Sequence, residues 1–144
     1  MANLSLKTRR ALARGIHRGT ARAWSNRKFL GIGNRATLTT ALAGTNNDLT
    51  FLAKTPGTAG NSVRVRIVVA GASTALSVSV ASSDITVNSA TDGASAATST
   101  AKDVIQAVNF SATAAALVWA QDAPASDGSG VVAALGYTNL AGAV

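Results

Sequence analysis

The chain has 144 residues, of which 47% are hydrophobic but only 4% are aromatic, and its formal net charge is +7. It contains no cysteine, which excludes disulfides, thiolate nucleophiles and zinc–thiolate sites, and no glutamate, which excludes a glutamate acid–base pair. Because a core of small aliphatic side chains buries little area per residue, we expect a lone subunit to be modestly stable and to gain stability from neighbouring subunits.

The basic residues are concentrated in the N-terminal third of the chain. Residues 1–47 carry nine lysines and arginines and no acidic residue, whereas the remainder carries four basic residues and six aspartates, so that +9 and −2 sum to +7. This asymmetry indicates an acidic partner for the N-terminal segment. We therefore expect two regions, a basic arm and linker over residues 1–46 and a β-rich compact domain over residues 47–144.

The arm has the periodicity of an imperfect basic helix. Its cations recur three or four residues apart from Lys7 to Arg22, which places them on one helical stripe, while apolar residues up to Trp24 fall on another. Gly15 and Gly19 weaken this helix, as does repulsion between like charges four residues apart. We expect a short helix in an extended arm that a partner orders. The residues expected to contact that partner are Lys7, Arg10, Arg14, Arg18, Arg22, Trp24, Arg27, Lys28 and Phe29.

Two aromatic residues lie among the cations of the arm. Trp24 and Phe29 interleave with Arg22, Arg27 and Lys28. Such a mixture can anchor a segment in an apolar groove of another protein, or it can stack on nucleic-acid bases. We favour the protein groove and retain base stacking as the alternative.

From residue 49 onwards the pattern is that of short strands separated by turns. Along residues 62–70, valines and Ile67 alternate with Arg64 and Arg66, so that one face of this strand is apolar and the other is basic. The short links to the next two segments predict an antiparallel meander with one buried face. The predicted strands are residues 49–53, 62–70, 76–80, 85–87, 117–120 and 137–140.

One main helix is predicted after the first four strands. Thr100 followed by Asp103 resembles a capping box with aspartate in place of the usual glutamate. The apolar residues from Ala101 to Val108 then share one helical face, which we expect to cover the apolar face of the sheet. Ser111 is predicted to cap a further short turn. The predicted fold class is α+β: a small antiparallel β-sheet or β-sandwich-like domain, covered by one main helix and preceded by the basic arm.

The large apolar residues are assigned to the core or to subunit contacts. Phe51, Phe110 and Trp119 are predicted to fill the core of the domain. The C-terminal segment has more apolar residues than one small sheet needs and few charges, which predicts a homo-oligomer, most simply a trimer. The residues expected to contact a second subunit are Val131, Val132, Leu135 and Leu140.

The sequence offers little catalytic chemistry. His17 is the single histidine, and it lies within the arginine stripe with no acidic residue within thirty positions. The aspartates lie mostly in turns, and Asp122 with Asp127 would provide too few oxygens for calcium. No apolar run approaches the roughly 20 residues of a membrane span. We therefore expect no enzymatic activity, no metal, no cofactor and no membrane partner.

Three segments of the domain are distinctive. They are Leu49–Asn61 (LTFLAKTPGTAGN), with its Thr-Pro-Gly-x-x-Gly-Asn loop, Ala97–Asn109 (ATSTAKDVIQAVN) and Gly130–Gly142 (GVVAALGYTNLAG). Together with the alternating strands between them, they resemble a small domain that recurs in structural proteins of tailed bacteriophages, over about two-thirds of the chain. The resemblance implies a structural protein of the virion, in capsid or tail, without catalytic residues.

The resemblance and the basic arm together predict a capsid decoration or cement protein. It would lie on the capsid surface of the virion after synthesis in the host bacterial cytoplasm, with the phage major capsid protein as the partner of its arm. One alternative is a nucleic-acid-binding internal head protein, which the nine cations favour. Another is a component of the tail tube, sheath or fibre, which the resemblance also permits. An arginine-rich, acid-free start is also typical of organellar transit peptides, and the phage-like domain disfavours that interpretation.

Overall fold

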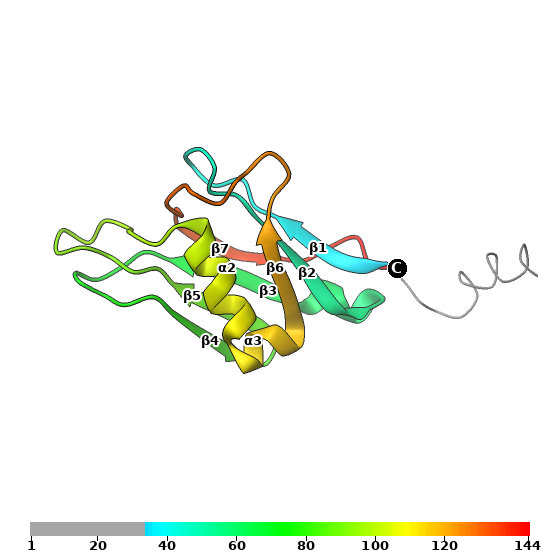
Figure 1. Ribbon diagram of the computed structural model, residues 1–144. Coiled ribbons are helices and arrows are strands. Elements are labelled where there is room, and N and C mark those ends of the chain that lie inside the picture. The colour runs from blue at the N-terminus through cyan, green and yellow to red at the C-terminus, as the bar shows by residue number, and fades with distance from the viewer. Residues whose placement is uncertain (1–33) are drawn as a thin grey trace, which may run out of the picture. The chain divides into compact units, whose positions relative to one another are not determined.

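The computed structural model describes residues 34–144, so the arm residues predicted to bind a partner, from Lys7 to Phe29, lie outside the described range. Within that range, short strands and two helices are separated by loops at most of the predicted turns. In chain order the elements are β1 (Arg35–Thr39), β2 (Leu49–Pro56), the 3-10 helix η1 (Thr58–Ser62), β3 (Arg64–Val68), β4 (Ser77–Ala81), β5 (Asp84–Asn88), α2 (Ala101–Phe110), α3 (Ala112–Leu117), β6 (Val118–Asp122) and β7 (Leu135–Asn139) (Figure 1).

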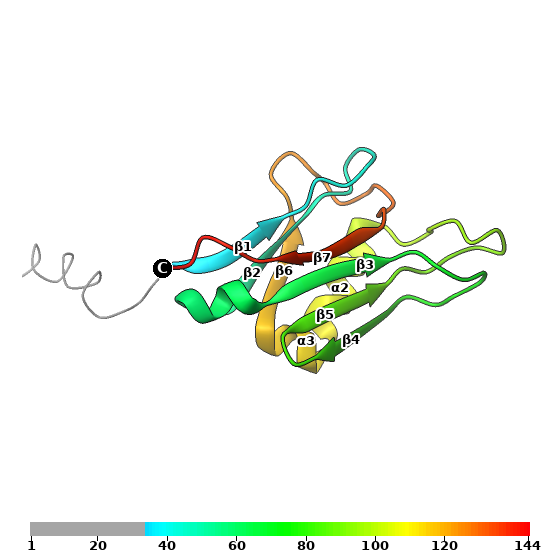
Figure 2. The same ribbon diagram turned by 180° about the vertical axis from the view of Figure 1, so that it is seen from behind.

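The strands form two small sheets. A three-stranded sheet has the order β1-β2-β6, and a four-stranded sheet has the order β4-β5-β3-β7. The C-terminal segment connects them, because Ala141 exchanges two backbone hydrogen bonds with Thr37 of β1, with N–O distances of 2.8 and 3.0 Å. Figure 2 shows β7 lying between β1 and β3. Two small sheets with helices make the domain α+β, as predicted, and are compatible with a sandwich-like arrangement.

The predicted antiparallel meander over residues 62–88 is wrong in its strand pairing. β4 and β5 form an antiparallel hairpin across the turn at Ser82–Ser83, but β3 pairs with β5 in parallel, from Arg64 opposite Asp84 to Val68 opposite Asn88. β4 therefore lies at the edge of the sheet. The 15 residues between β3 and β5 are enough for the crossover that a parallel pair requires. Alternation predicts which face of a strand is buried, and it carries no information about which strands are neighbours.

The compact unit begins at Asn34, earlier than the boundary expected between residues 46 and 47. The difference is β1, which pairs with β2 and buries Ala36 completely. Its sequence RATLT contains a single large apolar side chain, so its alternation is too weak to indicate a strand. The loop after β1 is held by the carboxylate of Asp48, which accepts hydrogen bonds from Thr40 Oγ1 at 3.1 Å and from the backbone N–H of Leu42 at 2.7 Å.

The hydrophobic core takes side chains from both sheets and from α2. Phe51 of β2 is its largest fully buried member, as predicted. The same prediction is wrong for Phe110 and Trp119, which are 80% and 50% exposed. Phe110 follows the buried Val108 by two residues, about 200° round the helix, so it points away from the core. Trp119 alternates with the buried residues on either side of it in β6, which directs it outward.

The capping box predicted for α2 is present. The Asp103 carboxylate accepts hydrogen bonds from the backbone N–H of Thr100 at 2.8 Å and from its hydroxyl at 2.7 Å, and the backbone N–H of Asp103 donates to Thr100 Oγ1 at 3.3 Å. The bond from the Thr100 backbone, followed by the one from its side chain, holds the pKa of Asp103 below its ordinary value of 3.8. Ser111 caps α3 as predicted, since its side chain accepts from the backbone N–H of Ala114.

Replacing Thr100 with alanine is expected to lower the free energy of unfolding by about 1 kcal/mol at pH 7, because the start of α2 loses its side-chain partner. A carboxylate with a lowered pKa in the folded state adds stability that is present above the unfolded pKa and is lost as the pH falls through the folded one. The difference between wild type and Thr100→Ala should therefore shrink below pH 3.8. Urea unfolding at pH 7 and pH 3 measures it, and a difference that grows in acid would contradict the assignment.

Candidate functional site

The four C-terminal residues predicted to contact a second subunit separate into two pairs. Val132 and Leu140 are buried within the subunit and belong to its own core, which corrects their assignment as subunit contacts. Val131 is 45% exposed, and Leu135 is half-buried against the core. The C-terminal segment has fewer spare apolar residues than expected, because β7 and the residues around it complete the core between the two sheets.

A cluster of charged, polar and aromatic side chains lies on the outer face of the four-stranded sheet. It consists of Arg64 and Arg66 from β3, Asp84 and Thr86 from β5, and Tyr137 from β7, and we call it the arginine–tyrosine cluster. The parallel register places Arg64 beside Asp84 and Arg66 beside Thr86. Because Val65 and Ile67 face the core, alternation directs both arginines to the opposite face.

A bulge in β7 brings Tyr137 to the same face. The pairing of β7 with β3 shifts between two points, Val65 opposite Thr138 and Ile67 opposite Leu135, so two residues of β7 oppose the single Arg66. The extra residue allows Tyr137 to face outward while Leu135 still packs against the core. Without the bulge, strict alternation would turn one of these two side chains to the wrong face.

Arg64 and Asp84 form the neutralised part of the arginine–tyrosine cluster. Arg64 Nε donates to Asp84 Oδ1 at 2.7 Å, and Nη2 donates to Oδ2, which is a bidentate arrangement. The hydrogen bond from Arg64 is the main cause that lowers the pKa of Asp84 below its ordinary value, and the same bond raises the pKa of Arg64. This pair fixes one edge of the cluster and has no net charge.

Arg66 forms the charged part of the cluster. Its Nε donates to Thr86 Oγ1 at 2.9 Å, and Thr86 is only 7% exposed although it lies on the outer face of the sheet. The guanidinium carbons of Arg64 and Arg66 lie 4.8 and 4.6 Å from the centre of the Tyr137 ring, within the range of cation–π attraction. The Tyr137 hydroxyl lies 3.4 Å from Thr86 Oγ1. The buried hydroxyl of Thr86 thus orients Arg66 beneath a partly exposed aromatic ring.

The sequence pattern identified Arg64 and Arg66 as the outer face of a strand and assigned them no role. Asp84 lies 20 residues after Arg64, and Tyr137 lies 71 residues after Arg66. Their proximity depends on a parallel pairing and on a bulge that alternation does not predict. The single available signal was the pair of arginines two residues apart on a strand that was expected to have one polar face.

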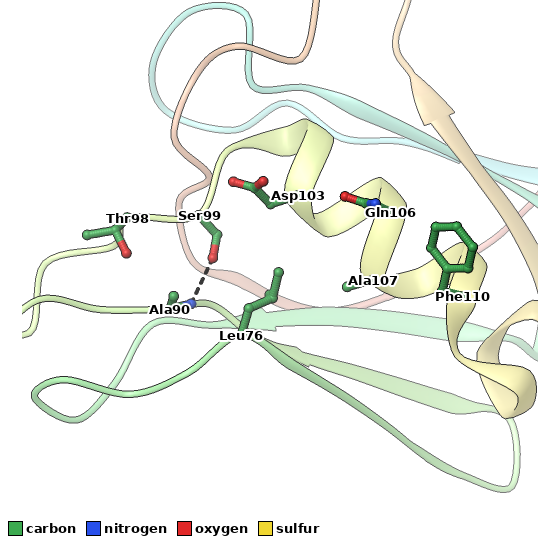
Figure 3. A pocket seen from close by; sticks show the side chains of 8 residues that line it. All are labelled: Leu76, Ala90, Thr98, Ser99, Asp103, Gln106, Ala107 and Phe110. Atoms are coloured by element: carbon green, nitrogen blue, oxygen red, sulfur yellow. Dashed lines mark hydrogen bonds between the residues drawn. The ribbon is translucent and has the colours of Figure 1, made fainter.

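A second feature is an open groove of about 440 Å³ beside α2, shown in Figure 3. Its large apolar side chains are Leu76 and Phe110, and its one charged group is Asp103, whose carboxylate already accepts a hydrogen bond from the start of α2. Among the lining residues, the backbone N–H of Ala90 donates to Ser99 Oγ at 2.8 Å. The residues that line it are Leu76, Ala90, Thr98, Ser99, Asp103, Gln106, Ala107 and Phe110. These groups can pack against a side chain, and they include no nucleophile paired with a base.

Two further properties of residues 34–144 bear on function. No group of three or more histidine, cysteine, aspartate or glutamate side chains in this range is placed to hold a metal ion. None of the helices described there is both long enough and apolar enough to cross a membrane.

Comparison of the chain with models of known protein families, with curated proteins and with solved structures finds no match in any of the three. Function is therefore inferred from the charge distribution, the sequence pattern and the geometry of residues 34–144.

Proposed function

We propose that this chain is a structural protein of a tailed-bacteriophage virion that decorates and stabilises the capsid, with its basic N-terminal arm bound to the major capsid protein. The observation that carries the proposal is the division of charge. Residues 1–33 hold eight basic residues and no acidic one, whereas residues 34–144 hold five basic and six acidic residues, so that +8 and −1 sum to +7. An attachment segment is thereby joined to a nearly neutral domain.

The energetics of the arm favour a partner with a large, repeated surface. Ordering a backbone residue costs on the order of 1–2 kcal/mol, so ordering some thirty residues requires an extensive interface. A capsid lattice provides such an interface at every subunit position. The aromatic residues Trp24 and Phe29 would add apolar anchors to the ionic contacts of the arm.

The domain itself has features that suit a protein that assembles with others. β4 ends the four-stranded sheet, and its residues Ser77–Ala81 carry no charge or proline that would protect a free edge from pairing with another strand. Val131 and Val144 are exposed apolar residues near the C-terminus. We include a homo-oligomer on the virion, most simply a trimer, in the proposal.

The finer architecture is also part of the proposal: α2 is the main helix that covers the apolar face of the sheet. Its residues Val104 and Val108 are buried. Asn109 fastens the end of the helix to β6, because its side-chain amide donates to the Ala120 carbonyl at 2.8 Å and accepts from the Ala120 N–H at 2.9 Å. These two hydrogen bonds occupy the backbone N–H and carbonyl of Ala120 on the outer edge of β6, where they would otherwise be free to pair with another strand.

A second candidate function is nucleic-acid binding inside the head. It is favoured by the eight acid-free cations of residues 1–33, which match the electrostatic requirement for phosphate binding. The net charge of −1 on residues 34–144 counts against a domain that reads nucleic-acid sequence. A role in the tail tube, sheath or fibre is supported by the resemblance of the domain to structural proteins of tailed bacteriophages.

Deleting residues 1–33 is expected to leave a folded domain that no longer decorates capsid particles. The remaining residues keep both sheets and the buried core, so the melting temperature should change little. Particle binding is measured by co-sedimentation with undecorated capsids at increasing protein concentration. Lys54→Gln in the full chain is the matched control, because it removes one exposed cation from the domain, and it should leave occupancy unchanged. Full occupancy by the truncated protein would contradict the proposal.

A further inference from the structure

The arginine–tyrosine cluster has the geometry of a small anion-binding site, and we infer that it binds an aspartate or glutamate side chain of a partner protein. The inference concerns the described domain, and it does not rest on attachment of the arm or on a capsid as the partner. Its central residue is Arg66, whose guanidinium is oriented on the outer face of the sheet.

Arg66 is held by one of its nitrogens, and its two terminal nitrogens remain available as hydrogen-bond donors. Its Nε is used by Thr86 Oγ1 at 2.9 Å, and among residues 34–144 its Nη1 and Nη2 donate to no protein acceptor. Arg64 differs, because Asp84 already occupies its fork. A guanidinium held at Nε by a buried hydroxyl presents its two terminal nitrogens in a fixed plane, and that arrangement matches the two oxygens of a carboxylate.

Tyr137 gives the site a second kind of contact. Tyr137 is 42% exposed, and the centre of its ring lies 4.6 Å from the Arg66 guanidinium carbon, so apolar surface and donor nitrogens lie side by side. The methylene groups of an aspartate or glutamate can pack on the ring while the carboxylate meets Arg66. The residues around the cluster on this face, such as Ser79 and Asn139, are small and uncharged, which leaves room for an approaching chain.

The charge distribution favours a protein carboxylate over a nucleic-acid backbone. A nucleic-acid backbone is bound by several cations along its length, whereas residues 34–144 place one guanidinium without a carboxylate partner on this face. The described domain has five basic and six acidic residues in total, so no basic field surrounds the cluster. One carboxylate for one guanidinium is the stoichiometry that fits.

The carboxylate is expected to come from a protein other than this chain. The first acidic residue in the sequence is Asp48, so the arm of a neighbouring copy has no carboxylate side chain to offer. Five of the six aspartates are engaged locally by side-chain or backbone groups, and the remaining one, Asp122, has Oδ1 buried. The engaged residues are Asp48, Asp84, Asp92, Asp103 and Asp127.

The test is a nuclear magnetic resonance titration of the full-length, isotope-labelled chain with a hexaglutamate peptide whose two termini are blocked. The blocked termini leave side chains as the only carboxylates. Residue-resolved signals separate the cluster from the basic arm, whose eight cations are also expected to bind the peptide. We expect the Arg66 Nε–H and Tyr137 backbone N–H signals to shift and to saturate. In Arg66→Gln the dissociation constant reported by Tyr137 should rise about fivefold, the loss expected for a strong exposed ion pair.

Three comparisons make the result decisive. Lys54→Gln removes the same charge from an exposed position on β2 and should leave the titration of the cluster unchanged. Arg66→Lys keeps the charge without the planar fork, and it should bind with an intermediate affinity. A single-stranded oligothymidylate should shift the signals of the arm and leave the signals of the cluster unchanged.

The inference is overturned if the cluster signals do not shift with the peptide, if they titrate with the same dissociation constant in Arg66→Gln, or if only the oligonucleotide shifts them. Particle binding is measured separately, so failure here leaves the proposed role of the arm intact.

Discussion

Replacing Phe51 with alanine is expected to lower the free energy of unfolding by about 3–5 kcal/mol, whereas the same change at Phe110 should alter it by less than about 0.5 kcal/mol. Phe51 is the largest fully buried side chain, and its removal leaves a cavity in a core that is otherwise built from valine, isoleucine, leucine and alanine. Phe110 lies at the end of α2 and is 80% exposed, so its truncation removes few contacts.

The two variants form a matched pair, because the substitution is identical and the burial is opposite. Chemical unfolding followed by far-ultraviolet circular dichroism measures both at equal protein concentration, which matters if subunits associate. Trp119→Ala should behave like Phe110→Ala, since its side chain also points away from the core. Equal losses at Phe51 and Phe110 would contradict the placement of Phe110, and would indicate that a second subunit buries it.

The parts of the fold that depend on local chemistry were predictable from the sequence. Alternation located β3, β4 and β5 to within one or two residues and assigned Arg64 and Arg66 to the outer face. Thr100 and Asp103 marked the start of α2, because a capping box needs only two residues at fixed spacing. The Pro/Gly loop predicted over residues 54–61 is an exception, because β2 extends to Pro56 and the 3-10 helix η1 begins at Thr58.

The parts that depend on contacts between distant segments were not predictable. The parallel pairing of β3 with β5 follows from tertiary packing, because the alternation of apolar residues in β3 and in β5 is equally compatible with β4 as a neighbour. β1 escaped detection because four of its five residues are small or polar and its place is fixed by β2 and Ala141. Trp119 and Phe110 were assigned to the core by residue type alone, which the local alternation of β6 and the helical period of α2 override.

The candidate site illustrates the same limit. Each member of the arginine–tyrosine cluster is an ordinary strand residue, and the cluster exists because a parallel register aligns Arg66 with Thr86 and a bulge turns Tyr137 outward. Val132 and Leu140 show the converse, because residues that looked like surplus apolar surface are needed to complete the core. Whether a segment has more apolar residues than its own core needs can be judged only when the number of sheet faces to be buried is known.

The largest expected effect separates attachment to a protein shell from binding to nucleic acid. For duplex DNA, each neutralised phosphate steepens the dependence of affinity on salt by a slope of about −0.9. The arm of residues 1–33 has eight cations, so DNA affinity should fall by roughly 10³–10⁵ between 50 and 200 mM salt. The truncated chain that begins at Asn34 should bind DNA weakly at both salt concentrations, because its formal charge is −1.

Binding to capsid particles should respond far less to the same change in salt. If Trp24 and Phe29 insert into an apolar groove, part of the affinity comes from buried contacts that salt screens poorly. The measurement is a pair of titrations of the full-length chain at 50 and 200 mM salt, one with a labelled duplex and one with undecorated capsids. We expect capsid binding to survive at 200 mM while DNA binding is lost. Tight DNA binding at 200 mM without affinity for capsids would instead establish the internal nucleic-acid-binding role, since only contacts beyond simple phosphate neutralisation would resist that concentration of salt.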